Sequence, residues 1–267
     1  MPADIARLTE DYERYLRDSF DTLWSQVKVE ADKLEAYSAI GGLLARQVTL
    51  SLELARSPGT WNGHSAPLFL RAMTDLYIAL AWILGDLKVR AEQYIKHGLG
   101  EEKLLMELYK QKRDELEPGE QRCQMEKIVE IKENWINFQR REFFVEVNLG
   151  NWSPLNYRQM AEESECLDLY NFAYKPFSHV AHNMWPHVSV YNSRICSNPL
   201  HRNHLIPALN DAPIDADYLY RSIKYVDKAY RLFAEKLKLL GLEIYPLDWW
   251  EAYVDEIHSV PGESEQS

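Results

Sequence analysis

The stretch from residue 66 to residue 85 limits the possible folds more than any other part of the sequence. Written as a helix, it carries apolar side chains around nearly its whole circumference, namely Leu68, Phe69, Leu70, Met73, Leu76, Tyr77, Ile78, Leu80, Trp82, Ile83 and Leu84. A helix that is apolar on all sides has to be buried on all sides. The sequence therefore predicts a helical protein with this segment at the centre of its core.

The few polar residues of this segment then become informative. Arg71 and Asp75 lie four residues apart, on one face of the expected helix. The preceding helix offers a similar polar row that includes Arg46 and Glu53. A charge inside a helical core costs several kcal/mol unless it is paired. Two interpretations stay open: a structural ion pair that fixes helix register, or a functional site.

Apolar residues recur at a spacing of three and four along most of the chain, which is typical of amphipathic helices. We therefore expect an all-α fold, a single helical-bundle domain with flanking N- and C-terminal helices. The expected parts are a flanking helix at 1–33, a core domain at 34–258 with an irregular segment at 188–213, and a disordered tail at 259–267.

Four further helix boundaries follow from capping and breaking residues. The second helix should end near residue 57, before Pro58 and Gly59, and the last long helix should run over 214–240 and stop at Gly241. The helix after Asp86 should pause at 97–100. A long charged helix is expected at 120–146, with its buried side formed by Cys123, Ile128, Ile131, Trp135, Phe138 and Phe143.

The composition excludes several classes of protein. A net charge of −11 argues against broad binding to a phosphate backbone, so any contact with RNA must be local. Three cysteines without close spacing suggest neither a disulfide framework nor a zinc site built of thiolates, and we expect a reducing cytoplasm. The N-terminus lacks the pattern of a signal peptide, and the most apolar run, 76–84, is far short of the roughly 20 residues that span a bilayer.

The segment 170–187 concentrates the residues that could carry chemistry. Tyr170, Tyr174, Ser178 and His182 step by four, which keeps them on one slowly turning face of a helix. Pro176 should bend this helix. The segment also contains His179 and His187, which gives it three of the eight histidines of the chain.

A family resemblance rests on these two regions. The residues that carry it are Leu70-Arg-Ala-Met-Thr-Asp-Leu-Tyr-Ile-Ala-Leu-Ala-Trp-Ile-Leu-Gly-Asp86, Arg90-Ala-Glu-Gln-Tyr94, Trp152, and Tyr170-Asn-Phe-Ala-Tyr-Lys-Pro-Phe-Ser-His-Val-Ala-His182. Over residues 35–190 the chain resembles a bacterial helical family of unknown function, DUF5677. That family shows an arginine and an acid four residues apart on a core helix, followed by a Tyr…Tyr…Ser…His pattern. Asp75 stands where glutamate is more usual, and the spacing favours His182 over His179 for the histidine.

The family layout is in turn similar to that of HEPN-type helical proteins of microbial defence and toxin systems, many of which are metal-independent ribonucleases. The resemblance thus implies a catalytic group made of Arg71, Asp75, Ser178, His179 and His182. A histidine could take a proton from an RNA 2′-hydroxyl, and a fixed guanidinium could stabilise charge on the phosphate. Asp75 would orient one of these two.

Two alternatives remain beside the ribonuclease. The first is a non-catalytic interaction module, a homodimer or a binder of a partner protein through its aromatic surfaces. The second is a metal-binding protein, because His179 and His182, and again His201 and His204, have a His-x-x-His spacing that can hold one ion. No carboxylate motif accompanies either pair, so no metal or other cofactor is predicted. We expect substrate or partner contacts at Arg46, Glu53, Tyr170, Tyr174 and His187.

Overall fold

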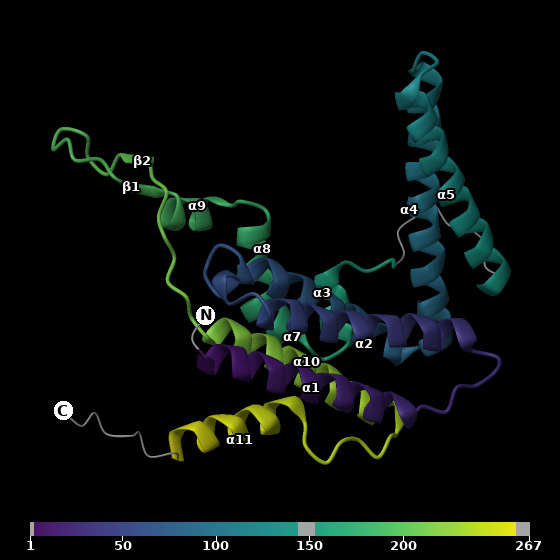
Figure 1. Ribbon diagram of the computed structural model, residues 1–267, viewed down its shortest axis with the longest axis horizontal. Coiled ribbons are helices and arrows are strands. Elements are labelled where there is room, and N and C mark those ends of the chain that lie inside the picture. Colours follow the sequence, from purple (N-terminus) through teal and green to yellow (C-terminus); the bar gives the residue numbers. More distant parts are fainter. Residues whose placement is uncertain (1–2, 144–152, 260–267) are drawn as a thin grey trace. The chain divides into compact units, whose positions relative to one another are not determined.

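The computed structural model describes residues 3–143 and 153–259, and this part of the chain is helical apart from loops and one short two-stranded sheet (Figure 1). The predicted all-α class is confirmed. The chain divides into two compact units, which are described separately. Unit 1 comprises Met1–Lys28, Gly42–Trp82 and Tyr157–Ser267, and unit 2 comprises Val29–Gly41 and Ile83–Asn156.

The first three helices follow the apolar pattern of the sequence. They are α1 (Ala3–Ser25), α2 (Leu34–Ala55) and α3 (Ala66–Gly85), with a single 3₁₀ turn, η1 (Pro58–Thr60), between the last two. The predicted bounds of α3 are confirmed. Helix α1 ends eight residues earlier than predicted, because none of residues 24–33 offers a buried apolar side chain and Val29 is about half exposed.

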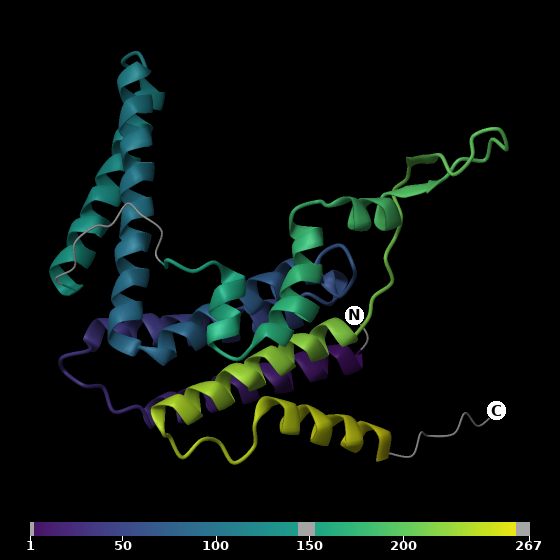
Figure 2. The same cartoon turned by 180° about the vertical axis from the view of Figure 1, so that it is seen from behind.

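A chain of buried hydroxyl groups links three helices of unit 1. Helix α10 (Asp217–Leu237) runs beside α1, and α11 (Pro246–Ser259) packs against α10 (Figures 1 and 2). Ser51 on α2 is hydrogen-bonded to Tyr12 of α1 at 2.8 Å and to Ser222 of α10 at 3.0 Å. The buried hydroxyl groups satisfy one another, which fixes the register of the three helices.

The end of α10 differs from the prediction. The helix stops at Leu237, and Lys238 takes the left-handed conformation with φ of 55°. The N–H of Leu239 then donates to the carbonyl of Ala234 at 2.9 Å, which is the bonding pattern of a Schellman cap. Gly241, expected as the cap, also has a positive φ but lies in the following loop.

A series of short elements connects α6 to α10 within unit 1. In chain order they are α6 (Tyr157–Glu163), α7 (Leu167–Leu169), the π-helical turn η2 (Tyr170–Tyr174), α8 (Lys175–Ala181), α9 (Trp185–Tyr191), β1 (Ser193–Ile195) and β2 (Leu205–Pro207). The segment 188–213, expected to be irregular, thus contains the end of α9 and an antiparallel hairpin in which Arg194 pairs with Ile206. Figure 2 shows the hairpin projecting from the helices of unit 1.

Unit 2 is dominated by the antiparallel pair α4 (Leu87–Glu115) and α5 (Glu120–Phe143). The predicted pause at 97–100 is wrong, because α4 runs through it. Leu99 is only 2% exposed, and its packing outweighs the weak helix propensity of the two neighbouring glycines.

The predicted buried side of α5 is also wrong. Val129 and Ile136 are buried, and Met106 of α4 joins them in a small core. Cys123 is exposed, as are the large apolar side chains at four other positions of the predicted stripe, Ile128, Ile131, Trp135 and Phe138. Helix α4 packs against the side of α5 that carries Val129 and Ile136, not against the most apolar side of α5. The side chain of Phe143, the predicted helix end at 144–146, Trp152 and the tail residues 260–267 lie outside the described residues.

Helix α3 is long and apolar enough to cross a bilayer by length and composition, the one described helix that meets both conditions. The central helix of a protein core meets the same conditions. Leu70, Met73 and Ile78 of α3 have no exposed surface, as the predicted core position requires. The expected burial on all sides is wrong, because Leu68 in the first turn is 48% exposed. The absence of a membrane span stays a prediction.

Candidate functional site

Helix α3 brings Arg71 and Asp75 together on one face, as their spacing predicts. The guanidinium Nη1 of Arg71 forms an ion pair with Asp75 Oδ2. The Arg71 side chain is 12% exposed and that of Asp75 is 31% exposed, so the pair is sheltered but reaches the surface of unit 1. Such a pair is stronger than an exposed one, because less water screens it.

The second part of the site comes from η2 and α8. A π turn lies where a proline bend was predicted: the N–H of Lys175 donates to the carbonyl of Tyr170, five residues back. Pro176 then occupies the first turn of α8, where its missing N–H leaves no bond unmade. Short π-helical segments occur frequently at functional sites. Here the turn places Tyr174 and Ser178 on the side of α8 that meets Arg71.

Arg71 joins the two helices through contacts with two side chains. Its Nε donates a hydrogen bond of 2.7 Å to Ser178 Oγ, which in turn donates to the carbonyl of Tyr174 at 2.9 Å. The guanidinium carbon lies 3.4 Å from the centroid of the Tyr174 ring, the geometry of a cation–π contact. We call Arg71, Asp75, Tyr174 and Ser178 the Arg71 cluster. The expected contact between the core helix and the helix after Pro176 is therefore present.

Burial controls the electrostatics of the Arg71 cluster. It raises the pKa of the Asp75 carboxyl above its ordinary value of 3.8, while the hydrogen bond and charge of Arg71 and the charge of His182 act in the opposite direction. Burial also raises the pKa of Tyr174, and the Asp75 charge adds to this effect. Within the described part of the chain, the buried Oδ1 atom of Asp75 has no hydrogen-bond partner. This atom is the open acceptor of the cluster.

The aromatic surroundings of the cluster form a stack of tyrosines. The Tyr174 ring stacks on Tyr170 with centroids 4.7 Å apart, and on Tyr157 with centroids 5.5 Å apart. All three side chains are partly exposed. Tyr170 and Tyr174 were predicted as binding residues, and the structure places both at the cluster. Tyr157 comes from α6 and was not predicted, because nothing in the sequence relates it to a residue 17 positions away.

The two candidate histidines lie at the end of α8. His182 is exposed, its backbone N–H donates to the Ser178 carbonyl at 3.0 Å, and its charge acts on Asp75. His179 is partly buried on the same helix. Among the described residues, neither ring makes a hydrogen bond to the Arg71 cluster. Of the two histidines, His182 is the one whose charge lowers the pKa of Asp75.

The remaining predicted site residues lie apart from the cluster. Arg46 and Glu53 are exposed on α2, and Glu53 pairs with Arg56 at 2.9 Å. His187 on α9 stacks on Tyr191 at 4.7 Å and meets His64 edge to face at 5.9 Å. Burial and the neighbouring His64 lower the pKa of His187.

Metal-binding geometry occurs at a different place from the Arg71 cluster. Among the described residues, Cys196, His201 and His204 form the group that could hold a metal ion, with their ligand atoms all within 4.8 Å of one another. Neither His179 nor His182 belongs to this group. The sequence showed His201 and His204 as a pair, but the contribution of Cys196 depends on the turn of the hairpin.

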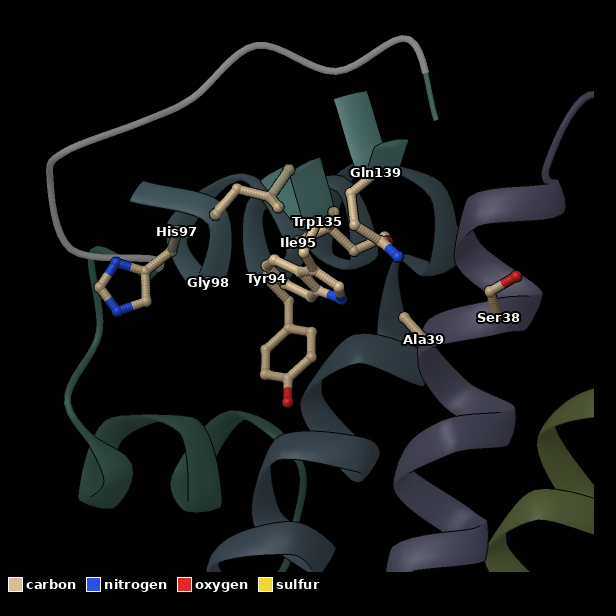
Figure 3. Close-up of a pocket in the computed structure, with 9 residues that line it drawn as sticks. Ser38, Ala39, Tyr94, Ile95, His97, Gly98, Trp135 and Gln139 are labelled. Carbon is tan, nitrogen blue, oxygen red and sulfur yellow. The ribbon is translucent and has the colours of Figure 1, made fainter. Parts of the chain in front are cut away.

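A pocket of about 500 Å³ lies within unit 2 (Figure 3). Its lining is mostly apolar, with the rings of Tyr94 and Trp135 facing its interior and His97 at one side. The other lining residues are Ser38, Ala39, Ile95, Gly98, Leu99 and Gln139. None of the predicted site residues lines this pocket, and a few polar groups in an apolar hollow suit a small apolar ligand.

The fold and the site define an all-α protein in which an arginine–aspartate pair on a core helix is bonded to a serine and a tyrosine after a π turn. The model of a family described as "Family of unknown function (DUF5677)" matches residues 37–198, more than half of the chain, and the chain belongs to that family. The match contains every residue of the Arg71 cluster. Neither the curated proteins nor the solved structures contain a significant match to the chain.

Proposed function

We propose that this protein is a metal-independent ribonuclease of a bacterial defence or toxin system, with its active site at the Arg71 cluster. The observation that carries the proposal is the Arg71 guanidinium, held between Asp75, Ser178 and Tyr174. A cation fixed in this way needs little reorganisation when it meets a phosphate. The resemblance of this layout to HEPN-type proteins, drawn from the sequence, supports the choice of RNA.

The proposed chemistry uses His182 as general base. Its imidazole takes the proton of a ribose 2′-hydroxyl, and the 2′-oxygen then attacks the adjacent phosphorus. The bond to the 5′-oxygen breaks, and that oxygen takes a proton from water, while the protonated His182 returns its proton to the hydroxide that remains. Arg71 balances the charge that grows on the phosphoryl oxygens. The products are a 2′,3′-cyclic phosphate and a 5′-hydroxyl end.

The stacked tyrosines supply a surface for the bases. Each stacked base contributes about 1–3 kcal/mol to binding without sequence preference. The partly exposed rings of Tyr157 and Tyr170 lie beside the cluster through their contacts with Tyr174. This arrangement suits a short single-stranded segment, which is the local contact that a chain with a net charge of −11 permits.

The test is cleavage of single-stranded RNA by purified protein in excess chelator, with the cleaved ends identified by mass spectrometry. We expect cyclic phosphate ends from the wild type and a loss of rate of about 100-fold or more in His182→Ala and Arg71→Lys. Arg71→Lys keeps the positive charge but loses the guanidinium group that bonds both Ser178 and Asp75. His179→Ala and Arg46→Ala are the matched controls, since among the described residues the ring of His179 makes no hydrogen bond to the cluster and Arg46 is exposed on α2.

Expression in a bacterial host gives a second measurement. Wild type should slow growth and degrade total RNA, while His182→Ala should do neither at equal protein level and equal helical circular dichroism. Intact RNA in all cultures, together with no cleavage by purified wild type, would reject the ribonuclease. Equal loss in His179→Ala and His182→Ala would reject the assigned base.

A helical interaction module is the second candidate, and one observation favours it. The exposed side chains Ile128, Ile131, Trp135 and Phe138 follow a spacing of three, four and three along α5. This spacing is the a/d pattern with which helices pair. In this role α5 binds α5 of a second copy of the chain. Light scattering tests it: Ile131→Glu should convert a dimer to a monomer, whereas Leu240→Glu, on a fully exposed loop, should not.

A further inference from the structure

The β1–β2 hairpin brings together three side chains suited to a transition-metal ion. Cys196 directly follows β1, and His201 and His204 lie in the loop that leads to β2, a Cys-x₄-His-x₂-His pattern. Their ligand atoms are mutually within 4.8 Å. Cys196 is a free thiol. A thiolate with two imidazoles is a donor set that suits zinc.

The distance between the first two ligands matches a tetrahedral site. Zinc binds sulfur at about 2.3 Å and imidazole nitrogen at about 2.05 Å, so a tetrahedral angle places the two ligand atoms about 3.6 Å apart. The separation of Cys196 Sγ and His201 Nδ1 is 3.6 Å. The two atoms can therefore bind one ion without moving relative to each other.

The loop is arranged to hold these ligands. The N–H of Cys196 donates to the carbonyl of His204 at 2.8 Å, which closes the base of the loop. Asn198 accepts a hydrogen bond from the N–H of Leu200 at 3.0 Å, and its amide lies 3.2 Å from Nε2 of His201. This contact turns the other ring nitrogen, Nδ1, toward the thiol. With zinc on Nδ1 the proton sits on Nε2, and this N–H can donate to the amide oxygen of Asn198 only when the amide rotates and gives up the N–H of Leu200.

The hairpin also lacks a core that would stabilise it. Its strands have three residues each, and none of residues 196–204 is buried. Leu200 at its tip is 88% exposed. A two-stranded hairpin of this kind is at best marginally stable in water. A metal ion that crosslinks the two ends of the loop supplies the missing stabilisation, as in other small metal-bound elements.

We propose that Cys196, His201 and His204 bind one Zn²⁺ ion that fixes the hairpin, with Cys196 as a thiolate and a water molecule in the fourth position. The site is separate from the Arg71 cluster and takes no part in the proposed RNA cleavage. Its failure and the failure of the ribonuclease are distinguishable, because the cleavage assay contains chelator.

Two measurements on the full-length, tag-free chain test the site. Elemental analysis should find one zinc per chain after purification without chelator. Titration of the apoprotein with Co²⁺ should give a thiolate-to-metal charge-transfer band and the intense visible bands of tetrahedral cobalt. Cys196→Ser should abolish the charge-transfer band and weaken binding roughly 100-fold or more, since even the loss of an outer hydrogen-bond partner costs 10–100-fold. Cys123→Ser and His179→Ala, the matched controls, should bind as wild type does.

Limited digestion with trypsin reports on the hairpin itself. Arg202 is exposed in the loop, so zinc should slow cleavage after it about tenfold in wild type and have no effect in Cys196→Ser. Cleavage elsewhere gives the internal reference. Absence of zinc with no cobalt charge-transfer band would overturn the proposal. So would loss of metal in His179→Ala to the same extent as in His204→Ala, with both variants folded.

Discussion

Replacement of Arg71 by methionine should destabilise unit 1 by about 3 kcal/mol. The change removes a charged hydrogen bond to Ser178, worth about 1.5–3 kcal/mol, and a cation–π contact with Tyr174. It also leaves Asp75 without its cation. Removal of one partner of a fully buried pair costs about 3–5 kcal/mol, and the 31% exposure of Asp75 places this case at the lower end.

The assay is equilibrium unfolding in urea, followed by tryptophan fluorescence and circular dichroism. The double variant Arg71→Met/Asp75→Leu should recover most of the lost free energy of unfolding, because the uncompensated carboxylate is gone. Arg46→Met, at an exposed position of α2, is the matched control and should change the free energy by no more than about 0.5 kcal/mol.

The result also separates a structural role from a catalytic one. If the double variant is stable and still cleaves RNA, the guanidinium only fixes helix register and the proposed mechanism is wrong. If Arg71→Met is as stable as Arg46→Met, the reasoning about the buried pair is refuted. A stable double variant without cleavage would support both roles.

Two further predictions concern stability. Because the folded-state pKa of Asp75 is raised, the folded state holds the carboxyl proton more tightly than the unfolded state does, so the free energy of unfolding should fall as pH rises from 3.8 through the raised value. Asp75→Asn should not show this fall when its pH profile of stability is compared with that of wild type. Parallel profiles of the two proteins would contradict the prediction. Ser51→Ala should lower the free energy of unfolding by about 1–2 kcal/mol, because it leaves the buried hydroxyl of Tyr12 unpaired. Thermal unfolding beside exposed Thr49→Ala checks this, and equal effects would contradict it.

The sequence was most informative where one pattern had a single physical solution. The all-round apolar segment 66–85 could only be a core helix, and its two charges had to find partners. Arg71 and Asp75 are four residues apart, so their pairing follows from helix geometry alone. The meeting of this helix with the segment after Pro176 was also predicted, on the resemblance and the spacing of Tyr174 and Ser178.

Other features had more than one local solution, and packing chose between them. Either face of α5 could have been buried, and contact with Met106 selected Val129 and Ile136 rather than the more apolar side. The glycines at 98 and 100 permit a break in α4, yet packing of Leu99 keeps the helix continuous.

The sequence by itself determined the helical class, the central helix and the charged pair on it, because these depend on residues within a few turns of one another. Only the tertiary structure decided that Tyr157 stacks on Tyr174, and that Cys196 joins His201 and His204. Such contacts depend on the paths of intervening turns. Those paths are fixed by the sum of many weak interactions across a unit, which no local pattern of residues encodes.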